Sequence, residues 1–319
     1  MLAHTLRLAL VVLLIPLASQ AATQAGPAAI QGREGWLFPA WELGTVADAQ
    51  PAVQLIGQTR EVLERRGIHL VVALTPSKVR IYPEYLPANL RLPAGFEISL
   101  ARQVTALREA GVEVVDLSGP MLAAKPRPQF LRTDSHWSVD AATAAARAVA
   151  SRVRATGWIA DLPKSDNPPL PRLREMHHVG DLVPLLPAIP GSRPDKMAET
   201  IQIFREPDEL ALLDDAGPLA DVVVIGSSFA EPKWGFPRAL GAALERPVGL
   251  LYGVGSYGYW YTLLDYLHGA DFRATRPRLL VWQITETALP NLPDSVTWKR
   301  NATLLPAGEW LRQVEQALR

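Results

Sequence analysis

DVVVIGSSFA, residues Asp221–Ala230, is the stretch that decides the fold of this chain. Its β-branched run is apolar throughout and too short for a helix, which is typical of a strand buried within a parallel sheet. In open α/β sheets, ligands bind beyond the carboxyl ends of such strands. Gly226 permits a tight turn at that end, and Ser228, third in the Gly-x-Ser turn, is the candidate nucleophile. The competing hydroxyl is that of Ser227, whose alternative role is to cap the helix that follows.

A second stretch, Leu131–Ser138 (LRTDSHWS), places an aspartate and a histidine two positions apart. If the segment is extended, Asp134 and His136 point to the same side, and Trp137 turns the other way as an anchor. A carboxylate and an imidazole that face one cleft from a short loop are two parts of an acid–base system. What they lack is a nucleophile.

The loop is expected to end at a helix, since Ser138 has the position of an N-cap and the run after it is rich in alanine. Asp134, His136 and Ser228 would together make an Asp–His–Ser triad, because the order of such residues along the chain differs between folds. The alternative interpretation of the Asp-x-His pair is a capped turn with a surface histidine.

Composition limits the function classes that remain. The 319 residues include 32 basic and 32 acidic side chains, so there is no electrostatic reason to expect a nucleic-acid partner. The length suits one large domain or two small ones, and with 48% hydrophobic residues the chain has ample core. The sequence contains no cysteine, which excludes disulfides and thiolate zinc sites.

The first segment, Met1–Ala22, has the organisation of an export signal. His4 and Arg7 precede the apolar core Leu8–Leu17, and small residues follow at a cleavage site. The apolar core is shorter than the roughly 20 residues of a membrane span. We therefore expect a cleaved signal peptide, with retention as an N-terminal anchor as the alternative, and an exported body over residues 23–319.

The exported body alternates helices and strands at the spacing of βαβ units, which predicts a single α/β domain with a parallel sheet. Besides Asp221–Ala230, the predicted strands are His69–Thr75, Val112–Leu117, Val248–Tyr252 and Leu279–Thr285. The predicted helices are Ala47–Arg66, Glu97–Ala110, Pro237–Leu244 and Ala307–Leu318, the run after Ser138, and one ending near Leu267. Residues 161–215 have little periodicity and begin with a proline-rich stretch, so we expect an irregular insertion or lid over the cleft, with Ile201–Phe204 as a short strand.

Several polar and aromatic side chains are candidates for substrate contacts at the same edge of the sheet. Lys78 and Tyr82 lie in TPSKVRIYPEYLP (Thr75–Pro87), which is predicted to be a loop; their alternative role is loop packing and solvation. Aromatic side chains near the serine strand and its neighbour could stack on sugar rings, although large aromatics more often pack in a core or at its rim. These aromatic candidates are Trp234, Tyr257 and Tyr259.

A metal site would need a different arrangement of ligands. His177 and His178, with Asp134 and His136, offer imidazoles and a carboxylate, but their spacing matches no standard ligand pattern. Adjacent histidines on a loop are more often solvated or part of a lid. The sequence therefore predicts no metal and no cofactor.

Six segments in chain order carry a resemblance to a known family: GREGWLF, TPSKVRIYPEYLP, TDSHWS, VGDL, VVVIGSSF and LLVWQITE. They resemble the alginate O-acetyltransferase family of the AlgX/AlgJ type, over roughly residues 32–286. The resemblance implies a three-layer, SGNH-hydrolase-like (flavodoxin-like) α/β sandwich with a central parallel sheet. It also implies a circularly permuted motif order, in which Asp-x-His precedes the serine. By position, the family's catalytic residues fall on Asp134, His136 and Ser228. One departure is Ala230, where the family usually has a small polar residue.

The resemblance also implies a reaction and a setting. The expected reaction is O-acetylation of an exopolysaccharide, such as alginate, in the periplasm through an acetyl-serine intermediate. A membrane O-acyltransferase would supply the acetyl group, and the polysaccharide would accept it. The oxyanion would meet the backbone N–H of Ser228 and further donors from the Gly253–Tyr257 loop. Two alternatives stay open: a carbohydrate acetyl esterase with the same triad, and a non-catalytic periplasmic scaffold of a polysaccharide machine.

Overall fold

The computed structural model describes residues 28–164, 173–187, 194–204, 220–255, 257–298 and 304–319. The predicted export segment, Met1–Ala22, lies outside the described residues. Within the described part, no helix is both long and apolar enough to cross a membrane.

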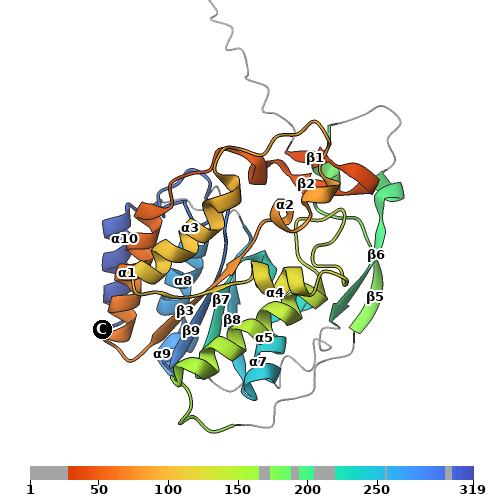
Figure 1. Cartoon of the computed structure of the whole chain (residues 1–319). Coiled ribbons are helices and arrows are strands. Elements are labelled where there is room, and N and C mark those ends of the chain that lie inside the picture. Colours follow the sequence, from red (N-terminus) through yellow and green to blue (C-terminus); the bar gives the residue numbers. More distant parts are fainter. Residues whose placement is uncertain (1–27, 165–172, 188–193, 205–219, 256, 299–303) are drawn as a thin grey trace, which may run out of the picture.

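A sheet of five parallel strands forms the centre of the protein (Figure 1). Its strands are β3 (His69–Thr75), β4 (Glu113–Asp116), β7 (Val222–Gly226), β8 (Val248–Tyr252) and β9 (Leu279–Thr285). They lie in the order β4-β3-β9-β7-β8, so the last strand of the sequence is the middle strand of the sheet. Every pairing is parallel, which brings the carboxyl ends of the strands to one edge. The predicted parallel sheet is confirmed, and β3, β8 and β9 have the bounds expected from the sequence.

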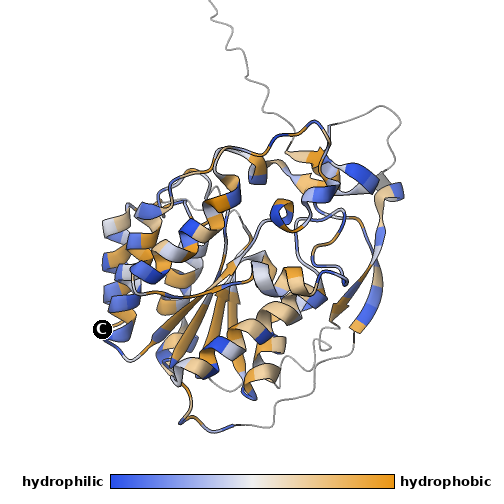
Figure 2. Ribbon diagram, viewed as in Figure 1, coloured by the Kyte–Doolittle hydropathy of each residue, from blue (hydrophilic) through white to orange (hydrophobic). Residues whose placement is uncertain are grey.

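Helices cover both faces of the sheet (Figure 1). One layer contains α1 (Gln50–Glu64), α3 (Phe96–Glu109), α8 (Tyr259–His268) and α10 (Ala307–Ala317). The other contains α4 (Ser118–Ala123), α5 (Val139–Thr156) and α7 (Phe236–Leu244). Strand β3 shows why two cores form, because Val71 packs with the α5 layer, whereas its neighbours Leu70 and Val72 pack with the α1 layer. The central strands are therefore hydrophobic along their length (Figure 2).

The smaller elements include two antiparallel pairs. β1 (Ala29–Gln31) pairs with β2 (Leu37–Pro39), and β5 (Leu173–His178) pairs with β6 (Glu199–Phe204). Among the described residues, the remaining elements are the helices α2 (Lys78–Ile81) and α9 (Ala270–Ala274) and short 3₁₀ turns at Arg33–Gly35, Ala40–Leu43, Pro83–Tyr85, Val183–Leu185, Pro194–Met197, Ser228–Ala230 and Pro232–Trp234.

Two segments differ from the expectation. TPSKVRIYPEYLP is predicted to be a loop, but it contains α2, which Ser77 caps by accepting the N–H of Arg80 at 3.3 Å. The insertion is predicted to be irregular apart from the strand Ile201–Phe204, which β6 confirms, but it also contains β5, which pairs with β6. Strand β5 (LREMHH) is largely polar and exposed, so it lacks the apolar alternation by which a half-buried strand is recognised.

Candidate active site

Strand β7 brings Ser228 to the carboxyl edge of the sheet, just beyond Gly226. A Cβ atom on Gly226 would lie 2.4 Å from Cβ of Ala230, so the turn requires glycine at this position. The backbone N–H of Ser228 has no acceptor within the part of the chain that the structure describes.

Ser227 has a structural role in the same turn. Its N–H and its hydroxyl donate to Oε1 of Gln283 at 3.0 and 2.8 Å, and its Oγ accepts the N–H of Phe229 at 3.3 Å. Gln283 lies on β9, and its Nε2 donates to Oγ1 of Thr75 on β3 at 2.9 Å. The capping role considered for Ser227 is confirmed, and its bonds tie the serine turn to the neighbouring strands.

The structure brings Asp134, His136 and Ser228 together from two loops that are far apart in the sequence; we call these three residues the triad. Nε2 of His136 lies 2.7 Å from Oγ of Ser228, and Nδ1 of His136 lies 2.7 Å from Oδ1 of Asp134. Trp137 is fully buried behind the loop, as expected of an anchor, and Ser138 caps α5. This series of hydroxyl, imidazole and carboxylate has the geometry of a nucleophile, its base and the group that orients the base.

Asp134 is almost completely buried, and N–H donors surround its carboxylate. Oδ1 accepts the backbone N–H of His136 at 2.8 Å and its Nδ1–H at 2.7 Å. Oδ2 accepts from Nε2 of His178 at 2.7 Å and from the backbone N–H of Asp181 at 3.1 Å. Burial raises the pKa of Asp134, but hydrogen bonds from the two imidazoles, the charge of His136 and the backbone N–H of His136 together hold this pKa well below its usual range. Since an ionised carboxylate only accepts, Nδ1 of His136 carries a proton, and in the neutral imidazole Nε2 is then the acceptor that faces Ser228.

His178 and Asp181 come from the insertion, and sequence reasoning missed both contacts. Asp181 accepts the N–H and the hydroxyl of Ser135 at 2.7 and 2.6 Å, and burial, with the charge of the triad carboxylate, raises its pKa. A Cβ atom on Gly180 would lie 2.0 Å from the carbonyl oxygen of Thr133, so only glycine allows this close approach. The VGDL segment, which carries part of the family resemblance, is a sequence signal near these residues. No spacing rule, however, links His178 to the carboxylate of Asp134, 44 positions away.

Comparison with known proteins places this chain in a family. The family model described as "SGNH hydrolase-like domain, acetyltransferase AlgX" matches residues 29–286. The chain belongs to this family. The resemblance and the fold class expected from the sequence are thereby confirmed, and the chain is assigned to a family of SGNH hydrolase-like acetyltransferases.

Relatives of the AlgX family extend over most of the chain. A Pseudomonas putida protein named "Probable alginate O-acetylase AlgJ" is 33% identical, over 84% of this chain and 72% of its own length. The solved O-acetyltransferase domain of Pseudomonas putida AlgJ has a TM-score of 0.70 and 28% identity, and the match covers 91% of this chain and 99% of that domain. Pseudomonas aeruginosa AlgX, at 20% identity and a TM-score of 0.60, shares the fold over 84% of this chain and 67% of its own.

The triad and its surroundings contain imidazole nitrogens and carboxylate oxygens, which are common metal ligands. Ligand atoms of Asp134, His136 and Asp181 lie within 4.8 Å of one another. However, each oxygen of Asp134 already accepts two N–H groups, so a cation would have to displace these donors. His177, considered above as a ligand, is exposed, since it alternates with His178 along β5. The geometry fits a hydrogen-bonded triad better than a metal site.

Lys78 does not border the cleft, which corrects its expected contact with substrate. The short helix α2 directs its side chain inward, where it is fully buried, and Nζ donates to the carbonyls of Arg132 and Asp134 at 3.0 and 2.9 Å. Burial lowers the pKa of Lys78 to about 7, although the carboxylate of Glu42 opposes this shift. Lys78 therefore supports the Asp134 loop from inside the protein.

Glu42 is buried beside Lys78 and gives a testable pH dependence. Burial raises its pKa from 4.5 to about 7. A group whose pKa rises on folding stabilises the fold fully below its unfolded pKa, and this stabilisation is lost as pH rises through the folded pKa. We therefore expect the unfolding free energy of the wild type, relative to Glu42→Gln, to fall by about 2 kcal/mol between pH 5 and 7. Urea denaturation of both proteins at both pH values tests this, and a difference that stays constant contradicts it.

Three aromatic side chains expected at the cleft are buried, which corrects their assignment. The hydroxyl of Tyr82 accepts the N–H of Gln129 at 2.8 Å inside the core. Trp234 is 1% exposed, and its ring stacks on that of His136 with centroids 5.5 Å apart, so it packs against the imidazole. Tyr259 is buried in the α1 layer, where its hydroxyl donates to backbone carbonyls.

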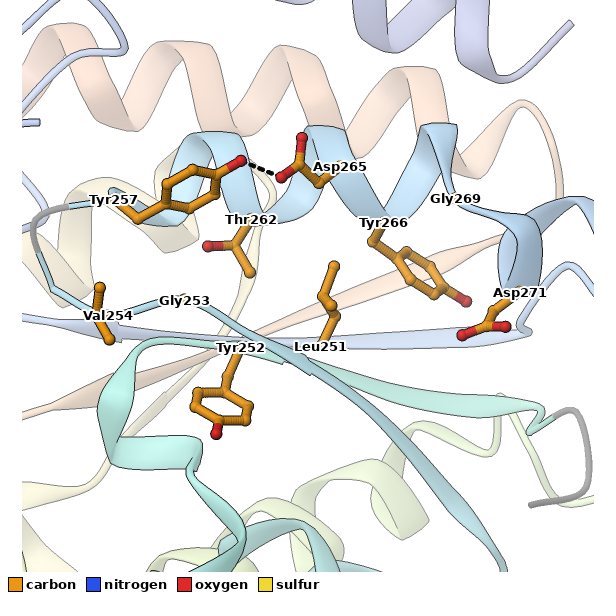
Figure 3. Close-up of a pocket in the computed structure, with 10 residues that line it drawn as sticks. All are labelled: Leu251, Tyr252, Gly253, Val254, Tyr257, Thr262, Asp265, Tyr266, Gly269 and Asp271. Atoms are coloured by element: carbon orange, nitrogen blue, oxygen red, sulfur yellow. Dashed lines mark hydrogen bonds between the residues drawn. The ribbon is translucent and has the colours of Figure 1, made fainter. Parts of the chain in front are cut away.

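Tyr257 lies in a pocket of about 400 Å³ between β8 and α8 (Figure 3). Its hydroxyl donates to Asp265, and burial together with this carboxylate raises the pKa of Tyr257 to about 12. Tyr252, one of the lining residues, pairs with Gly226 in the β7–β8 register, and its ring points away from α8 (Figure 3). The pocket therefore begins beside the strand that leads to Ser228.

The Gly253–Tyr257 loop, expected to supply oxyanion donors, uses two of its amides elsewhere. The N–H of Gly253 donates to the carbonyl of Gly226 at 3.0 Å, and the N–H of Tyr257 donates to the carbonyl of Val254 at 2.8 Å. The expectation is wrong for these two amides, because hydrogen bonds that shape the loop already occupy them.

Proposed function

We propose that this chain transfers acetyl groups to hydroxyls of an exopolysaccharide through an acetyl ester on Ser228. The observation that carries the proposal is the position of His136, whose two ring nitrogens lie 2.7 Å from Ser228 Oγ and 2.7 Å from Asp134 Oδ1. Membership in the AlgX family and the 33% identity to a protein named for alginate O-acetylation support the reaction and the class of acceptor.

In the first half-reaction, Oγ of Ser228 attacks the carbonyl carbon of an acetyl donor while Nε2 of His136 takes the hydroxyl proton. The bond between the acetyl carbon and the donor's leaving group breaks, and the imidazolium returns the proton to that group. Asp134 stabilises the imidazolium through its bond to Nδ1. The backbone N–H of Ser228 would donate a hydrogen bond to the oxyanion of the tetrahedral intermediate. One such donor typically stabilises the transition state by about 3 kcal/mol.

In the second half-reaction, a sugar hydroxyl takes the place of the leaving group. His136 removes its proton as the sugar oxygen bonds to the acetyl carbon, and Ser228 then leaves with that proton. Water in the same position would give hydrolysis, so transfer requires a site that holds the sugar hydroxyl in attack geometry and excludes water. We assign acceptor binding to the pocket between β8 and α8, where the ring of Tyr257 suits stacking on a sugar.

We further propose a periplasmic setting for this reaction. The segment Met1–Ala22 would direct export, and the polysaccharide would meet the enzyme outside the inner membrane. A membrane O-acyltransferase would supply the acetyl group as a covalent donor, which the first half-reaction requires.

The test of the proposed function follows acetyl from an activated acetyl ester in the presence of alginate oligosaccharides. We expect the oligosaccharide to become acetylated and the yield of free acetate to fall as its concentration rises, since sugar and water compete for one intermediate. Steady release of acetate with no acetylated sugar would replace transferase by esterase. Failure to cleave the ester at all would favour the scaffold.

A further inference from the structure

The β5–β6 pair contacts the triad loop through two residues that face each other. His178, the last residue of β5, and Glu199, the first of β6, are partners in the antiparallel register. Nε2 of His178 lies 2.7 Å from Oδ2 of Asp134. The carboxylate of Glu199 accepts the backbone N–H groups of Arg132 and Thr133 at 3.0 and 2.6 Å. One end of the strand pair thus holds both the carboxylate and the backbone of the triad loop.

The shared carboxylate explains what the second imidazole contributes. A carboxyl group turns with little resistance about the bond that joins it to Cβ. In this protein Oδ1 of Asp134 serves His136, while Oδ2 is held by His178 and by the backbone N–H of Asp181. Turning the carboxylate would break the bonds at Oδ2, so His178 fixes the plane in which Oδ1 meets Nδ1 of His136.

We propose that His178 is a positioning residue for acetyl transfer, because it holds the Asp134 carboxylate in the plane that aligns His136 with Ser228. This role rests on the proposed function of the triad, and His178 acts only through Asp134. It makes the β5–β6 pair part of the catalytic apparatus, whereas the sequence suggested only a lid. Mutating a residue that orients a directly acting group in this way typically lowers activity by about 10- to 100-fold.

The proposal can be tested by replacing His178 with two side chains that carry the same amide group but differ in length. His178→Gln places an amide N–H near the position of Nε2 and keeps a donor for Oδ2, whereas the shorter Asn carries the same amide but does not reach. We expect His178→Ala and His178→Asn to lower kcat for acetyl transfer by about 10- to 100-fold with KM for the donor unchanged, and His178→Gln to retain most activity. The matched control is His177→Ala, the exposed neighbour on the same strand, which should behave as wild type.

Rates are normalised to the concentration of folded protein, and thermal melting compares the stability of the variants. A loss of folded protein is thereby separated from a loss of kcat. If His178→Ala does not fold, the comparison of Gln with Asn carries the test alone. Wild-type kcat in His178→Asn, or equal damage in Gln and Asn, overturns the positioning role. A wild type that forms no acetyl-enzyme would instead overturn the proposed function, so the two failures are distinguishable.

Discussion

Replacing Ser228 by alanine is expected to lower kcat/KM for an activated acetyl ester by about 10³-fold or more, and replacing His136 by alanine should cost a similar factor. Without the hydroxyl there is no acetyl-enzyme, and without the imidazole there is no base 2.7 Å from Oγ. Because members of a triad act as a unit, the double variant should be little worse than either single one. Initial rates of leaving-group release measure all three.

Ser227→Ala is the matched control for the nucleophile. Its hydroxyl is bonded to Gln283, so its loss should loosen the turn and reduce the rate less than Ser228→Ala does. A fully active Ser228→Ala with an inactive Ser227→Ala would mean that the nucleophile has been assigned to the wrong serine.

Among these variants, Lys78→Ala should destabilise the protein most, lowering its unfolding free energy by about 3 kcal/mol or more. The change leaves the carbonyls of Arg132 and Asp134 buried without their donor. Denaturant unfolding of the purified variant at neutral pH gives the value.

Lys164→Ala is the control for the loss of a lysine charge. Lys164 pairs with Glu245 at the surface, where its side chain is 70% exposed, so solvent screens the pair and its loss should lower the unfolding free energy far less. Equal losses in the two variants would contradict the structural role of Lys78, since they would show that burial adds nothing.

Most of the fold is predictable because the central strands are nearly continuous apolar runs. His69–Thr75 and Leu279–Thr285 are covered by helices on both faces, so almost every position in them must be apolar. Strand β5 has no comparable pattern, since most of its side chains are exposed and, among the described strands, its backbone pairs only with β6.

The triad residues could be predicted from their spacing and local sequence pattern, whereas the residues that hold the Asp134 loop in place could not. Asp134 and His136 stand two positions apart, and Ser228 follows a recognisable strand and turn. The contact of His178 with Asp134 depends on how the insertion packs, which leaves no period or spacing in the sequence. Lys78 and Tyr259 seemed suited to a surface because of their polar ends, but backbone carbonyls satisfy those ends inside the protein.

The most direct test of the central claim is to find the acetyl group on the protein. The wild type is mixed with an activated acetyl ester, quenched in acid within the first turnover, digested, and mapped by fragment-ion mass spectrometry. We predict one acetyl group on Ser228, absent from Ser228→Ala and lost from the wild type when an acceptor oligosaccharide is added before the quench. An acetyl group on Ser227, or an unmodified serine turn while the leaving group is released at full rate, would contradict the account.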